Sequence, residues 1–174
     1  MKLTLFIRLF FMLAGILLIP MQTMAQDAQN NANPCVSTDA NLGDSAFWAN
    51  TSLNLFSEQK YVEAVANVDA CFNQWASGAV TLQQKFNGEK AKAPPLGDFS
   101  PSEKRKIQEN YLLNDVATAL WVKARSLEEL DEIELAKKVY SNCIYLSHGR
   151  AWDPSGWFWS PSEDCIKRGR KLLE

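Results

Sequence analysis

Apolar residues recur every three or four positions over two adjacent stretches of the chain, and this spacing is typical of amphipathic helices. In the first stretch, which begins at Gly43, one helical face holds Phe47, Trp48, Ser52, Leu55 and Phe56. A polar turn at 57–60 follows. In the second stretch the shared face holds Tyr61, Ala64, Val65, Val68, Cys71, Phe72 and Trp75. The pattern therefore predicts a pair of antiparallel helices.

Glycine and proline residues interrupt this spacing at 77–99, so we expect a connector there with one short helix at 82–86. The sequence that follows the connector, at 100–103, is typical of the start of a helix. Ser100 is suited to cap the helix, Pro101 to occupy its first position, and Glu103 to complete a capping box. We therefore expect the longest helix of the chain to begin here.

Apolar residues continue along one face of this helix, and the polar pair Asn114 and Asp115 is expected to kink or divide it. A turn at 130–132 leads to a returning helix that is expected to end before Gly149. The capping phrase recurs at 160–163 and predicts a last helix. The alternation typical of β-strands is not evident in the sequence, so we expect an all-α fold with five main helices.

The two helix pairs repeat each other at an offset of 72 residues, with 45–71 matching 117–143. The matched positions include Leu55 with Leu127, Ala64 with Ala136, Val68 with Tyr140, and Cys71 with Cys143. A repeated helix pair predicts a scaffold that stacks hairpins and presents a groove. Two pairs are fewer than the three repeats that usually stack stably, so either the disulfides and the last helix compensate or the chain forms a homodimer.

The repeated hairpin resembles the tetratricopeptide repeat. Small residues and one bulky residue occupy the matching positions of both pairs, namely Ser52 and Ala124, Ala64 and Ala136, and Val68 and Tyr140. The chain departs from the family pattern because it lacks the glycine of the first helix and the proline that ends a unit. Its offset of 72 residues also differs from a single step of about 34 residues.

The resemblance implies stacked antiparallel helical hairpins, closed by a C-terminal capping helix, in which the first helix of each pair lines a concave groove. Such a groove would bind another protein or an extended peptide. By this analogy the candidate contacts are Asn50, Asn54, Asn110, Asn114 and Lys123, since amide groups can bond a peptide backbone.

The first 25 residues have the layout of a secretory signal peptide. Lys2 and Arg8 precede an apolar block at 9–20, and small residues end the segment at Ala25. An uncleaved anchor is the alternative, although the block is shorter than the roughly 20 residues a membrane span needs. We therefore expect a signal peptide at 1–25, a polar lead-in at 26–42 and one domain at 43–174, with no membrane span after cleavage.

Charge and cysteine content point to an exported protein that does not bind nucleic acid. Removing Lys2 and Arg8 from the 18 basic residues leaves 16 against 20 acidic residues, a net charge of −4 and no large basic patch. All four cysteines lie after the signal peptide, and an even number in an exported chain predicts disulfides. Three pairings are possible, of which we favour Cys35–Cys71 and Cys143–Cys165. The expected location is the bacterial periplasm or the extracellular space.

A loop at 148–160 is dense in aromatic residues, with Trp152, Trp157, Phe158 and Trp159 close to Asp153. Two interpretations are open. The rings either cover the open end of the helical array or form a platform for sugars or proline-rich peptides. The tail also resembles small exported bacterial proteins labelled as β-glucanase precursors, which implies a glycan-binding or carbohydrate-active alternative that would use this loop.

Catalytic patterns are weak in this chain. A glycosidase needs two carboxylates across a cleft, but Glu163 is better explained as a helix cap and Asp153 as a turn residue. His148, the single histidine, follows the end of a helix and is expected to be structural. The sequence has no glycine-rich phosphate loop, GxSxG or HExxH motif. We therefore expect a protein that is not an enzyme and that holds no cofactor or metal.

Overall fold

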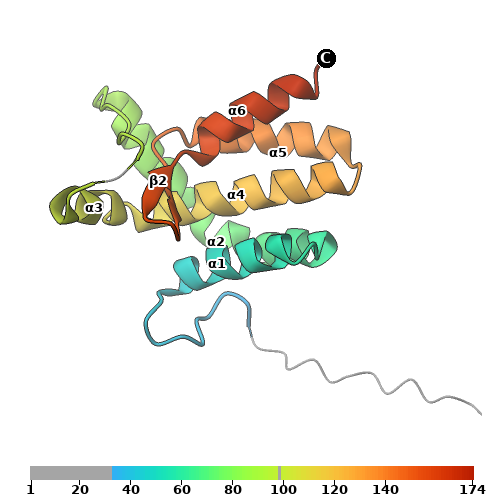
Figure 1. Cartoon of the computed structure of the whole chain (residues 1–174), viewed down its shortest axis with the longest axis horizontal. Helices are drawn as coiled ribbons and strands as arrows, with labels where there is room; N and C mark the ends of the chain where they lie inside the picture. The colour runs from blue at the N-terminus through green and yellow to red at the C-terminus, as the bar shows by residue number, and fades with distance from the viewer. Residues whose placement is uncertain (1–32, 98) are drawn as a thin grey trace, which may run out of the picture. The chain divides into compact units, whose positions relative to one another are not determined.

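The computed structural model describes residues 33–97 and 99–174 and has an all-α fold with one small β-hairpin (Figure 1). The signal peptide expected at 1–25 and the first part of the polar lead-in lie outside the described residues. The elements in chain order are α1 (Asp44–Ser57), α2 (Tyr61–Gly88), α3 (Pro101–Gln108), α4 (Tyr111–Glu129), α5 (Ile133–Tyr145), β1 (Ala151–Asp153), β2 (Trp157–Trp159) and α6 (Pro161–Lys171).

Helix α4 lies at the centre of the helical packing. It contacts α1, α2, α5 and α6, and it contributes more buried residues than any other helix. Figure 1 shows α4 between α1 on one side and α5 with α6 on the other. Helices α1 and α2 form one hairpin, α4 and α5 form the second, and α6 packs against α5. The C-terminal helix therefore covers the second hairpin.

The two hairpins share the same turn geometry at the 72-residue offset. Gln59 and Asp131 both have a φ of 61°. Lys60 N donates to Leu55 O and Glu132 N donates to Leu127 O, each at 2.9 Å. The aligned core residues are all at most 1% exposed, namely Ser52, Ala124, Ala64, Ala136, Val68, Tyr140, Cys71 and Cys143. The repeat seen in the sequence therefore corresponds to a repeat in local structure, while a relationship to tetratricopeptide proteins stays a prediction.

The connector begins later than the sequence suggested. Helix α2 continues to Gly88 and is the longest helix, with 28 residues. A Cβ atom at Gly78 would lie 2.6 Å from the Leu112 side chain, so this glycine permits close packing of α2 on α4. Ala79 and Gln83 are fully buried on the same helix. The prediction of a connector starting at residue 77 was wrong because Gly78 serves packing and does not end the helix.

The long helix expected from Ser100 is divided, but not at the predicted place. The break falls at Glu109 and Asn110, between α3 and α4, and gives six helices in the described part of the chain, where five were expected. At the break Ile107 O accepts hydrogen bonds from Asn110 N at 3.2 Å and from the Asn114 side chain at 2.9 Å. The predicted capping box at Ser100 and Glu103 is confirmed.

The aromatic loop contains an antiparallel β-hairpin that the sequence did not indicate. Trp152 pairs with Phe158, and Asp153 pairs with Trp157. Gly156 closes the turn with a φ of 107°, a conformation that favours glycine. Each strand has only three residues, which is too short to produce a clear alternation of polar and apolar positions.

Both favoured disulfides are present. Cys35–Cys71 joins the segment before α1 to α2, with a Cα–Cα distance of 5.5 Å, and Cys143–Cys165 joins α5 to α6, at 6.3 Å. Two disulfides indicate an oxidising environment outside the cytosol. Within the described part of the chain, no helix has the length and apolar character needed to cross a membrane.

Candidate functional site

A broad groove runs along the face formed by α1, α4, α6 and the β-hairpin, and has a volume of about 1210 Å³. This volume exceeds the roughly 300–1,000 Å³ of typical small-molecule pockets. The groove is lined by polar and aromatic side chains that include Asn50, Asn54, Tyr111, Asp115, Trp121 and Trp157. The first helices of both hairpins therefore contribute to one continuous concavity.

The predicted peptide contacts divide into two groups. Asn50 and Asn54 are exposed on α1 and line the groove, as does Asn114 on α4. Asn110 lines a separate pocket of about 260 Å³, and Lys123 forms an ion pair with Asp69 of α2. The structure therefore brings three of the five predicted residues to the groove and places Asn110 and Lys123 elsewhere.

Asn114 has a structural function in addition to its position at the groove. Its side-chain oxygen accepts a hydrogen bond from Arg150 N at 2.9 Å, and its nitrogen donates to Ile107 O. The residue is 9% exposed. Because both ends of the amide are already bonded, Asn50 and Asn54 are the better candidates for contacts with a ligand.

The aromatic residues of the hairpin are partly core and partly groove wall. Phe158 is only 2% exposed, and the Trp159 ring packs edge-on against Trp121 with centroids 5.1 Å apart. Trp152 and Trp157 are each 40% exposed. Since neighbouring residues of a strand point to opposite faces, the pairing of Trp152 with Phe158 places Trp152 and Trp157 on opposite faces of the hairpin. These two rings do not form one flat platform.

Two further contacts limit the chemistry of this loop. The Lys104 ammonium lies 3.5 Å from the centroid of the Trp152 ring, so one face of that indole is already covered. Asp153 Oδ1 accepts a hydrogen bond from Ser155 N at 2.8 Å, which is a contact typical of a turn residue. Trp157 is therefore the hairpin side chain that is best placed to meet a ligand in the groove.

Arg150 attaches the hairpin region to the connector before α3. The residue is 4% exposed, and its guanidinium donates to the carbonyl oxygens of Pro94, Ser147 and Gly149. Burial lowers the pKa of Arg150 from its usual value, and the Glu163 carboxylate opposes that shift. Its donors already bond backbone carbonyls and are not open to a ligand. Arg150 therefore holds the hairpin in place as a wall of the groove.

Asp115 is a groove residue whose importance sequence reasoning missed, since the sequence suggested only a break in the helix at this point. Its carboxylate accepts a hydrogen bond from Ser45 Oγ at 2.6 Å. Burial raises the pKa of Asp115 to about 6, and the Ser45 hydrogen bond opposes the shift. The available signal was an acidic residue in a mostly apolar stretch of α4, directly after Asn114 and one turn after Tyr111.

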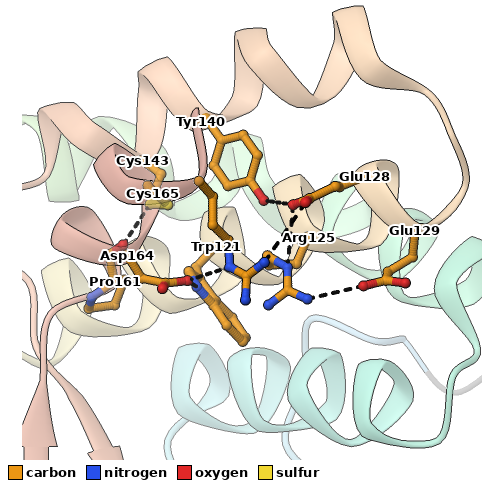
Figure 2. Close-up of polar contacts among 10 residues, drawn as sticks. Trp121, Arg125, Glu128, Glu129, Tyr140, Cys143, Pro161, Asp164 and Cys165 are labelled. Atoms are coloured by element: carbon orange, nitrogen blue, oxygen red, sulfur yellow. Dashed lines mark hydrogen bonds and ion pairs between the residues drawn. A yellow bond between two sulfur atoms is a disulfide. The ribbon is translucent and has the colours of Figure 1, made fainter. Parts of the chain in front are cut away.

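A polar network fixes α6 against α4 and α5 at one end of the groove (Figure 2). Asp164 accepts hydrogen bonds from Trp121 Nε1 at 2.7 Å and from Arg168 Nε at 2.9 Å. Glu128 accepts from the Tyr140 hydroxyl and lies 3.5 Å from Arg125 Nε. Burial, followed by the bond and charge of Glu128, raises the pKa of Tyr140 above its usual range. These pairings hold the helices together.

His148 makes contacts that support the structural function expected for it. Its backbone N–H donates to Gln83 Oε1, which leaves Gln83 Nε2 to donate to the ring Nδ1 at 2.8 Å. The ring Nε2 lies 3.0 Å from Ala91 O, where it must carry the proton. The ring therefore connects α2, the connector and the loop after α5. Among the described residues no group of His, Cys, Asp and Glu side chains is arranged to hold a metal ion.

Comparisons of the chain with protein-family models, with curated proteins and with solved structures find no match. The interpretation of the groove therefore depends on its own geometry and chemistry.

Proposed function

We propose that this chain is an exported, non-catalytic scaffold that binds an extended segment of another protein in the groove between α1, α4, α6 and the β-hairpin. The observation that carries the proposal is the groove itself, which exceeds a typical small-molecule pocket and is lined by the exposed amides of Asn50 and Asn54. Amide groups can donate to and accept from a peptide backbone, and the aromatic wall offers apolar contacts.

The proposed location is the bacterial periplasm or the extracellular space. The two disulfides support export, because cytosolic thiols are usually kept reduced.

A peptide selection tests the proposed function. Random 12-residue peptides displayed on phage are selected against the purified oxidised protein, and the affinity of the enriched peptides is measured by calorimetry. The double variant Asn50→Trp/Asn54→Trp fills the groove from an exposed face of α1. Asn142→Trp, on an exposed position of α5, makes one substitution of the same kind away from the groove.

We expect the groove variant to weaken peptide binding at least about tenfold and the α5 variant to leave it within twofold. Enrichment of no peptide, or equal effects of the two variants, would refute the proposal. Dimerisation is the competing use of the same surface, and a monomer–dimer equilibrium that the groove variant abolishes would assign the groove to a second copy of the chain.

A glycan is the alternative ligand, and the observation that favours it is the exposure of Trp152 and Trp157 on the hairpin. Binding of soluble β-glucan that is lost in Trp157→Ala would support this alternative. Hydrolysis of β-glucan by the purified protein, abolished in Asp153→Asn, would replace both binding proposals by an enzymatic one.

A further inference from the structure

The carboxylate of Asp115 has acceptor capacity that the described protein does not use. It lines the groove, and among the described residues Ser45 Oγ is the one hydrogen-bond donor to it. The ion pairs formed by the described residues do not include Asp115. A carboxylate has about four lone-pair positions, so most of its capacity is open to a molecule in the groove.

The environment of Asp115 favours a positively charged group. Burial makes the charged carboxylate costly, as the raised pKa records. A cation that reaches the carboxylate would restore the lost solvation through charge-assisted hydrogen bonds. An ordinary neutral donor would restore less of it. The missing counterion is therefore best supplied by the ligand.

The other charges of the groove agree with this assignment. Arg150 donates to backbone carbonyls, and Arg168 is paired with Asp164, so neither is available to neutralise Asp115. The groove is lined by four acidic residues, Asp115, Asp153, Glu163 and Asp164, and by three basic ones, Arg150, Lys167 and Arg168, which gives a net charge of −1. The groove is therefore weakly acidic, and a cation bound at Asp115 would balance that charge.

Tyr111 completes the site. It lies one helical turn before Asp115 on α4, so the two side chains share a face, and it is 61% exposed. An exposed aromatic ring next to a carboxylate suits the aliphatic stem and the charged head of a long basic side chain. A compact metal cation would make no use of the ring.

We propose that Asp115, with Ser45 and Tyr111, forms a specificity subsite that binds the side chain of one lysine or arginine in the peptide held by the groove. The inference rests on the proposed peptide-binding function and names the kind of residue that the groove selects.

The test compares the peptide selections of the native protein and of Asp115→Asn. We expect a lysine or arginine at one fixed position of the peptides that the native protein enriches, and no such preference with Asp115→Asn. Asp69→Asn is the matched control, since it makes the same charge change on α2 at a residue that pairs with Lys123 outside the groove. It should keep the preference.

A second measurement uses one selected peptide and its analogue with norleucine in place of the basic residue. The native protein should bind the basic peptide at least about tenfold more tightly, and Asp115→Asn should bind the two within twofold. Circular dichroism checks that each variant is folded. Peptides that bind in the groove without a basic preference would refute the subsite and leave the proposed function standing. A selection that yields no groove-binding peptide would instead refute the proposed function.

Discussion

At the residue scale, the groove contains a carboxyl group whose charged form is less stable in the folded protein than in the unfolded chain. Asp115 is partly buried on α4, and burial raises its pKa from 3.8 to about 6. The folded state therefore binds this proton more tightly than the unfolded chain does. Proton binding by Asp115 therefore stabilises the folded state. This stabilisation is complete below about pH 4 and is lost as the pH rises through about 6. Above that pH a charged carboxylate is retained at a cost, as is common at binding sites.

Replacing this carboxyl group by an amide should therefore stabilise the free protein in a pH-dependent way. Asp115→Asn is expected to raise the free energy of unfolding by up to about 3 kcal/mol at pH 7.5 and to leave it nearly unchanged at pH 4. Urea unfolding followed by circular dichroism measures both values. An equal effect at the two pH values would mean that Asp115 is not desolvated in the groove.

At the scale of elements, the shape of the groove depends on segments that carry little regular structure of their own. The β-hairpin has two strands of three residues, and an isolated hairpin of this size is not stable in water. Arg150 attaches it to the connector through Pro94 O, and Asn114 attaches it to α4 through Arg150 N. The bridge between Gly97 and Phe158 adds a further attachment to the connector.

Removing the Arg150 guanidinium should therefore loosen the hairpin more than the helices. Arg150→Met keeps most of the apolar stem but removes the donor to the buried carbonyl of Gly149 and to the partly buried carbonyls of Pro94 and Ser147, so we expect a loss of about 2–3 kcal/mol in the free energy of unfolding. Arg170→Met, at an exposed position of α6, is the control. Hydrogen exchange read by mass spectrometry should show faster exchange at 151–159 in Arg150→Met. Unchanged exchange there would contradict the anchoring function.

The same elements show how far sequence reasoning reached. Periodicity identified both helix pairs, and the cysteines near helix ends suggested the pairing that the structure has. The predicted end of the second helix was wrong because Gly78 packs against Leu112, a contact that the local sequence does not reveal. The hairpin was missed because its strands are held by distant contacts. The surroundings of Asp115 could not be predicted because they depend on the packing of α1, which places Ser45 within hydrogen-bond distance of the carboxylate.

At the scale of the whole molecule, two disulfides connect the segment before α1 and helix α6 to the rest of the helical core. Cys35–Cys71 closes a loop with a sequence separation of 36 residues, and Cys143–Cys165 closes one of 22. In the chain-entropy model each bridge contributes about 3–4 kcal/mol by restricting the unfolded state. Such a contribution is a large part of the stability of a domain of this size.

Removal of either bridge should therefore lower stability by a similar amount. We expect the pair Cys35→Ser/Cys71→Ser, and separately Cys143→Ser/Cys165→Ser, to reduce the free energy of unfolding by about 3–4 kcal/mol. Loss of the second bridge should also loosen α6, which forms one wall of the groove and would still be held to α4 by the hydrogen bond between Trp121 and Asp164. Urea unfolding gives the stability of each variant, and unchanged transition midpoints would show that the bridges do not stabilise the fold.

The central claim is that the groove between the first helices and the hairpin holds an extended peptide. The most direct measurement is the change in amide and indole NMR signals of the ¹⁵N-labelled protein on titration with a selected peptide. The account predicts changes centred on Asn50, Asp115 and the Trp157 indole, with Asn142 on α5 unaffected. Changes centred on α5, or none at saturating peptide, would contradict it.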